Sequence, residues 1–82
     1  MEARQLIGGA SFSPDMLRTI YGAFDDAWGE VAAEVSSRRS AIDAARLSLA
    51  TIVLSVARIG PIDRDSIRTA AITAFRIKHR IP

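Results

Sequence analysis

The chain has 82 residues, the size of one small domain, and its formal net charge is only +2. It contains no cysteine and a single histidine, His79, which excludes disulfides and thiolate metal sites and argues against a histidine metal site. The absence of cysteine favours a cytoplasmic protein. Because the core of so small a domain typically supplies about 3–5 kcal/mol, self-association is the remaining source of extra stability.

The charges are unevenly distributed along the chain. Residues 1–35 carry six acidic and two basic side chains, whereas residues 36–82 carry nine basic and three acidic ones. This asymmetry predicts attraction between the first helix and the rest of the chain, within one fold or between two copies. The alternative is that the basic part binds an anionic partner.

The first helix is predicted over residues 14–35, after a flexible N-terminal arm, residues 1–12. Ser13 is a good N-cap, and Pro14 suits the first helical position because the N–H that it lacks would be unpaired there. Apolar side chains then recur at helical spacing: Leu17, Ile20, Tyr21, Phe24, Ala27, Trp28 and Val31. We expect an amphipathic helix.

The second helix is predicted over residues 41–59. Ser40 is the preferred N-cap because Asp43 follows three residues later and completes a variant of the capping box. Gly60 suits the left-handed position after a helix, and Pro61 prevents continuation.

The third helix is predicted over residues 63–77, with Asp63 as N-cap and a basic tail, residues 78–82, behind it. Ile62 and Ile67 have the spacing of a hydrophobic staple. No segment competes as a strand, so the sequence predicts an all-α, three-helix bundle with one helical domain, residues 13–77.

The second helix has more apolar surface than a small bundle needs. Only eleven uncharged residues separate Arg46 from Arg58, which is too few for a membrane span of about 20 residues. Its apolar side chains nevertheless cover about 240° of the helix, against somewhat over 100° for an ordinary surface helix. The surplus predicts an interface of a homodimer or higher homo-oligomer, formed by Leu47, Ala50, Leu54 and Ala57.

Two alternatives remain for this second apolar face. In one, the chain is a monomer whose N-terminal arm covers the face through Leu6 and Ile7. In the other, the face binds a different protein chain.

Three acidic side chains, Asp26, Glu30 and Glu34, are stacked on one side of the first helix. Such a stripe can bind a hard cation, but carboxylate metal centres in bundles also need Glu-x-x-His pairs on other helices, which this sequence lacks. We expect a solvated or ion-paired face, with arginines such as Arg38, Arg39 or Arg46 as its partners. No metal is predicted.

The aromatic residues Phe24, Trp28 and Phe75 occupy apolar positions of their helices and are predicted to lie in the core. His79 lies beyond the last regular apolar position, and we expect it to be exposed and non-catalytic. The chain contains no Gly-rich phosphate loop and no nucleophile–base–acid set, so no enzyme activity and no cofactor are predicted.

The second and third helices superficially resemble a helix-turn-helix, with basic residues on the second member. Asp63 and Asp65 lie at the end where DNA contacts would be made, which argues against this interpretation. If the chain binds nucleic acid or another anionic partner, the contacts are predicted at Arg64, Arg68, Arg76, Lys78 and Arg80.

The strings AFDDAW (residues 23–28) and AARLSLATIVLSVA (residues 44–57) resemble short helical bacterial proteins that carry an aromatic-Asp-x-x-Trp motif before an arginine-headed apolar helix. The resemblance implies a helical fold and brings no activity, cofactor or site residues. The sequence therefore predicts a non-enzymatic protein–protein interaction module that homo-oligomerises through its second helix, with a small nucleic-acid-associated regulator as the alternative.

Overall fold

The computed structural model describes residues 3–35, 37–60 and 62–79. These residues form four α-helices, α1 (Ala3–Gly8), α2 (Pro14–Val31), α3 (Arg39–Ile59) and α4 (Arg64–Lys78), and a short 3-10 helix, η1 (Ala32–Glu34). No described residue lies in a strand. The prediction of an all-α fold is confirmed, with one helix more than expected.

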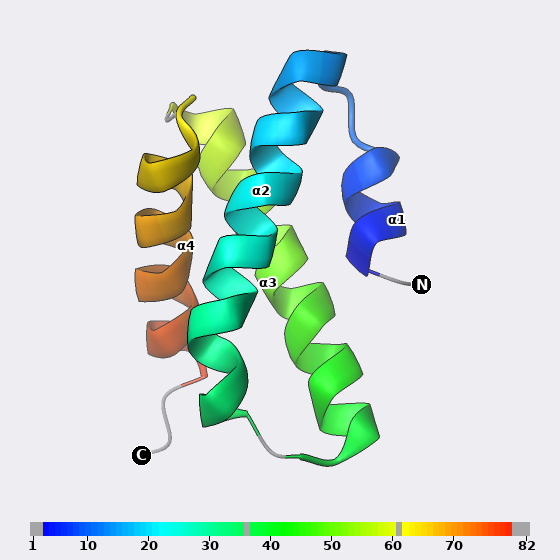
Figure 1. Ribbon diagram of the computed structural model, residues 1–82, viewed down its shortest axis with the longest axis vertical. Coiled ribbons are helices and arrows are strands. Elements are labelled where there is room, and N and C mark those ends of the chain that lie inside the picture. Colours follow the sequence, from blue (N-terminus) through cyan, green and yellow to red (C-terminus); the bar gives the residue numbers. More distant parts are fainter. Residues whose placement is uncertain (1–2, 36, 61, 80–82) are drawn as a thin grey trace.

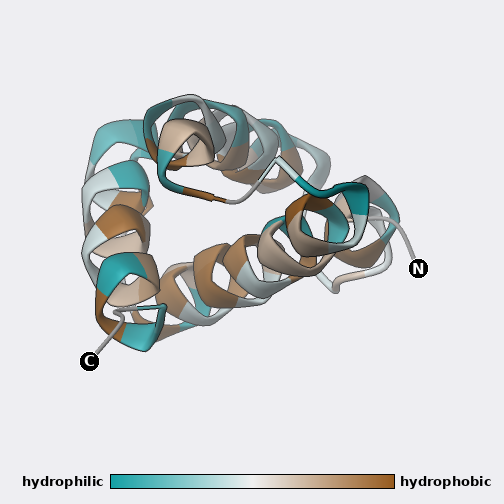
Figure 2. Cartoon of the chain, turned by 90° about the horizontal axis from the view of Figure 1, so that it is seen from below, coloured by the Kyte–Doolittle hydropathy of each residue, from teal (hydrophilic) through white to brown (hydrophobic). Residues whose placement is uncertain are grey.

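The helices α2, α3 and α4 pack against one another as a bundle, and α1 adds to one side of it. The short α1 contacts α3 and α2 and lies on the side of the bundle away from α4 (Figure 1). Seen from below, the helices surround a common interior, and α3 is coloured mainly brown to white (Figure 2). By length and composition alone α3 also qualifies as a membrane span, a test that core helices of soluble proteins pass as well.

Two of the predicted N-caps are confirmed. The Ser13 hydroxyl accepts a hydrogen bond from the backbone N–H of Met16 at 3.2 Å, and the Asp63 carboxylate accepts one from the N–H of Ser66 at 2.9 Å. Each bond satisfies a backbone donor that the first turn of a helix leaves unpaired.

The boundaries of the second predicted helix need correction. The helix α3 starts at Arg39 rather than residue 41, and Arg38 occupies the N-cap without a side-chain cap bond. Ser40 thus lies inside the first turn, because packing of the apolar face outweighs the local capping preference. Gly60 has a φ of 174°, which is extended rather than left-handed backbone. Pro61 lies outside the described residues.

The core forms where the three long helices face one another. Phe24 and Phe75 are buried there, as predicted, together with Ile20, Leu49 and Ile67. Trp28 differs from the prediction, because it is only half-buried. The register of α2 places it at the edge of the groove towards α3, where the Arg46 guanidinium lies 5.7 Å from the ring centroid.

Candidate interaction surface

The face predicted for self-association is covered within a single chain. Ala50, Leu54 and Ala57 are buried, and Leu47 is half-buried against the core. The cover is α1, whose Ile7 is fully buried against its neighbours.

The N-terminal arm therefore follows the alternative in which it docks on the second apolar face. Its residues Ala3–Gly8 are helical rather than a flexible arm, and Ala50, Leu54 and Ala57 are buried within the chain while α1 is seated. The physical reason is that the uncovered side of α3 offers a docking site to any nearby apolar segment, and the arm is the nearest one.

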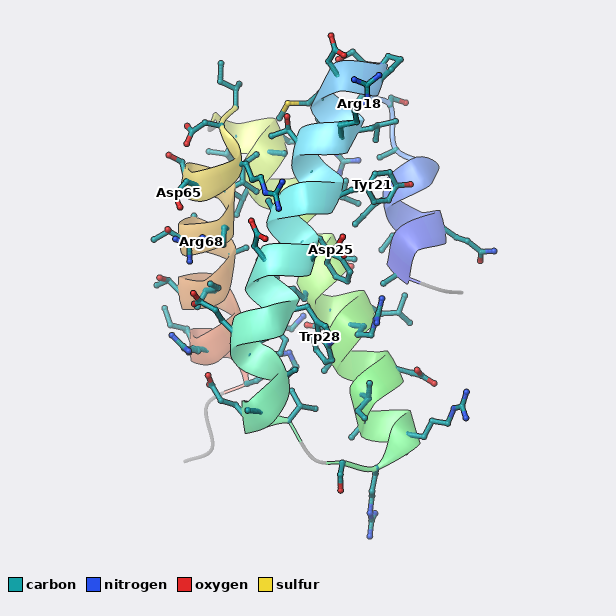
Figure 3. The ribbon with its side chains drawn as sticks, viewed as in Figure 1. Arg18, Tyr21, Asp25, Trp28, Asp65 and Arg68 are labelled. Carbon is teal, nitrogen blue, oxygen red and sulfur yellow. The ribbon has the colours of Figure 1, made fainter. Side chains whose placement is uncertain are left out.

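The acidic stripe, which runs along α2 and ends in η1, is paired with arginines of α4. The pairs join Asp26 to Arg64, Glu30 to Arg68 and Glu34 to Arg76, with shortest N–O distances of 2.7, 3.0 and 2.6 Å. On α4, Arg68 also bonds Asp65, one turn away, and Figure 3 labels both residues on that helix. The partners are therefore not Arg38, Arg39 or Arg46, because α2 packs its acidic side along α4.

These contacts change the acidity of the paired groups. The Arg64 guanidinium donates two hydrogen bonds to Asp26 and holds the pKa of that carboxyl below its usual value. Hydrogen bonds from Arg76 lower the pKa of Glu34 in the same way. Within the described part of the chain, no group of three or more acidic or histidine side chains is placed to hold a metal ion.

The residues predicted to meet an anionic partner are largely occupied. The guanidinium groups of Arg64, Arg68 and Arg76 already bond carboxylates, and a phosphate would have to compete with them. Lys78 is exposed at the end of α4, and Arg80 lies outside the described residues. The structure thus offers no row of unpaired arginines on α4.

His79 is exposed, as predicted, and it fixes the end of α4. Its Nε2 lies 2.8 Å from the Ser48 hydroxyl on α3, and its ring lies 4.3 Å from that of Phe75, centroid to centroid. The contact joins α3 and α4 at the C-terminal end of α4.

A surface without charges runs along the outside of α3 and α4. Helical register places small polar and apolar side chains of both helices along it, and we call this surface the α3–α4 face. It consists of Ser48, Ile52, Ser55 and Ile59 of α3, Ile62 of the link, and Ser66, Ala70, Thr73, Ala74 and Ile77 of α4. None of these residues is charged, although charged residues make up 24% of the chain.

The large apolar side chains that remain exposed in the described residues all belong to the α3–α4 face. They are Ile59, Ile62 and Ile77, with exposed fractions of 84%, 75% and 69%. The exposure of Ile62 also shows that the predicted staple with Ile67 does not hold it against the bundle. Arg58 and Asp63 bound the face at one end, and Lys78 lies at the other.

The sequence predicts Ile62 as a staple partner of Ile67 and assigns no role to Ile59 or Ile77. The available signal was the absence of charge from one side of both helices, which becomes visible only when α3 and α4 are placed next to each other. The surplus apolar arc predicted from the sequence lies on the side of α3 that α1 covers, where leucines are more numerous.

No protein-family model, curated protein or solved structure matches this chain. The resemblance to short helical bacterial proteins stays a prediction.

Proposed function

We propose that this protein is a non-enzymatic interaction module that self-associates through the α3–α4 face. The observation that carries the proposal is the exposure of Ile59, Ile62 and Ile77 on a surface without charges. Depletion of charged residues distinguishes the centre of a protein–protein interface from the rest of a protein surface. The proposal keeps the second predicted helix as the interacting element and moves the contact to its other side.

A second copy of the chain is the occupant that the charge pattern favours. In a two-fold symmetric dimer the same patch lies on both sides of the interface, so a patch with charges of one sign would repel itself. The α3–α4 face avoids this repulsion. Its serines, alanines and threonines are also small, which allows two helices to approach closely.

The dimensions of the face predict weak association. It extends about 17 Å along α4 from Ser66 to Ile77, and it is two helices wide, about 20 Å. A standard interface buries about 800 Å² of accessible surface per partner, and the α3–α4 face alone covers only part of that area. The monomer–dimer equilibrium is therefore expected to depend on concentration between about 20 µM and about 1 mM.

The proposal is tested by light scattering on a size-exclusion column with the variant Ile59→Asp/Ile77→Asp. The wild-type chain is expected to show a mass that rises with concentration and persists at high salt, since the contact is apolar. Two added carboxylates on each copy would face each other in the dimer, so the variant is expected to stay monomeric.

The matched control is Ala33→Asp/Ser37→Asp, which adds the same charge at exposed positions away from the α3–α4 face. Circular dichroism is used to check that both variants keep the helical fold. A wild-type chain that stays monomeric over the concentration range, or an Ile59→Asp/Ile77→Asp variant that associates like the control, would refute the proposal. No observation in the structure favours the nucleic-acid alternative.

A further inference from the structure

The helix α1 is too short to be stable without its neighbours. It has six residues, Ala3–Gly8, whereas isolated helices shorter than about 12–15 residues are marginal in water. Its helical state therefore depends on contacts with α2 and α3, mainly through Ala3 and Ile7, which are 2% and 0% exposed.

The link behind α1 allows it to move as a unit. Gly8 and Gly9 stand at the end of α1, and the turn there is closed by backbone bonds from Gly9 to Gln5 and from Ala10 to Ile7. These bonds form within the arm itself, so they do not tie it to the bundle.

Beyond this link the chain is anchored to the bundle independently of α1. Phe12 packs partly buried against the core, and the Arg58 guanidinium lies 6.0 Å from its ring centroid. Ser13 then caps α2. The hinge is thus confined to the few residues between α1 and Phe12.

The bundle keeps its main contacts without α1. Two of the three ion pairs join α2 to α4, the third joins Glu34 of η1 to α4, and the buried side chains Phe24, Leu49 and Phe75 come from α2, α3 and α4. What departure of α1 exposes is the groove between α2 and α3, including Leu54.

The groove is shaped for a closely seated helix. The Tyr21 hydroxyl on α2 would lie 2.7 Å from a Cβ added to Gly8, so the end of α1 approaches α2 closely. Figure 3 shows Tyr21 pointing from α2 towards α1, with Trp28 lower on the same side of α2. The segment known to fit this groove is α1 itself, and every copy of the chain carries one.

We infer that α1 is an exchangeable helix: it leaves the groove while the α2–α4 bundle stays folded, and the groove then accepts α1 from a second copy. Exchange reproduces the same contacts between copies, which makes it a low-cost way to join chains. This inference concerns the side of α3 that α1 covers and does not depend on the proposed function.

Hydrogen exchange of the wild-type chain tests the first half of the inference. The amides of Gly9 and Ala10, which are hydrogen-bonded to Gln5 and Ile7 of α1, are expected to exchange at least about ten-fold faster than those in the middle of α3, because local opening needs less free energy than global unfolding. If these two amides exchange only at the rate of the α3 core, α1 opens only with the whole fold and the inference is wrong.

Binding of a labelled peptide with the sequence of residues 1–13 tests the second half. Full-length Ile7→Asp, whose own α1 is unseated, is expected to bind the peptide at least about ten-fold more tightly than the wild-type chain, where the tethered α1 competes at high effective concentration. Ala33→Asp is the matched control: it adds the same charge at an exposed position outside the groove and should bind like wild type.

A peptide carrying Ile7→Asp should not bind, and a folded Ile7→Asp chain that ignores the wild-type peptide would overturn the exchange. If Ile7→Asp does not fold, the milder Ile7→Ala replaces it in the same assay with the same criterion. The assay measures binding of a peptide to the groove and not the mass of the chain, so its failure is distinguishable from failure of the proposed function.

Discussion

Replacing Ile7 or Ile20 by alanine removes the same three carbons from two sites that are both 0% exposed. At a core site whose contacts are lost only when the whole domain unfolds, such a change typically lowers the free energy of unfolding by about 2–5 kcal/mol. Ile20 lies in α2, between the other long helices, so its full cost should appear in the free energy of global unfolding. For Ile7 the cost is limited to the free energy that seats α1, because a detached α1 no longer affects the bundle. We expect a loss of about half the Ile20→Ala value or less.

Urea unfolding followed by Trp28 fluorescence and by circular dichroism measures both variants. The dependence of the unfolding free energy on urea should also fall in Ile7→Ala, because a native state with α1 detached has less surface left to expose. Ile20→Ala should keep the wild-type slope. Equal losses of stability in the two variants, with unchanged slopes, would show that α1 is part of the cooperative core and would refute this reasoning.

Three further predictions concern the stability effects of glycines in α2, of the ion pair of Glu34 and of the Ser13 cap. Gly29→Ala should raise stability by about 0.5–1 kcal/mol, because the added methyl group meets open space. Gly22→Ala should gain less, because the added Cβ would lie 2.7 Å from the Arg64 guanidinium. Thermal unfolding of the two variants measures the difference. Because folding lowers the pKa of Glu34, its ion pair contributes stability above the ordinary glutamate pKa and loses it as the pH falls through the folded value. The unfolding temperature of wild type should therefore drop more between about pH 5 and pH 3 than that of Glu34→Gln, and equal drops would contradict the pairing. Ser13→Ala should cost about 1 kcal/mol in chemical denaturation through loss of the cap, and no loss would show that the cap is not needed.

The features of the fold that could be predicted are those that depend on residues close together in the sequence. Ser13 and Asp63 cap their helices as expected, because a capping bond involves residues only three apart. The apolar spacing of α2 and α4 likewise placed Phe24 and Phe75 in the core.

The predictions that were wrong concern contacts between helices, which depend on which helices pack against one another. The acidic stripe could have met any of several arginines, and the choice of Arg64, Arg68 and Arg76 follows from packing α4 along α2. The helix α1 was missed because its six residues end in Gly8, with Gly9 directly behind it, and so short a segment carries little helical preference of its own. Contacts with α3 supply the stability that the local sequence of α1 does not provide.

The candidate surface was predicted only in part. The surplus apolar arc of α3 was recognised, but leucine content pointed to the side that α1 covers. The exposed side depends on isoleucines that are far apart in sequence, Ile59 and Ile77, and on the serines and alanines between them.

A dilution series of amide spectra tests the central claim most directly, because it reports both association and its location. Between about 1 mM and about 20 µM, a range that brackets weak self-association, we predict shifts confined to residues of the α3–α4 face, such as Ile59, Ala70 and Ile77. Amides on the acidic side of α2, such as Glu30, should stay unchanged. Spectra that do not change with concentration, or shifts that map to α2 instead, would contradict the α3–α4 face as the site of self-association.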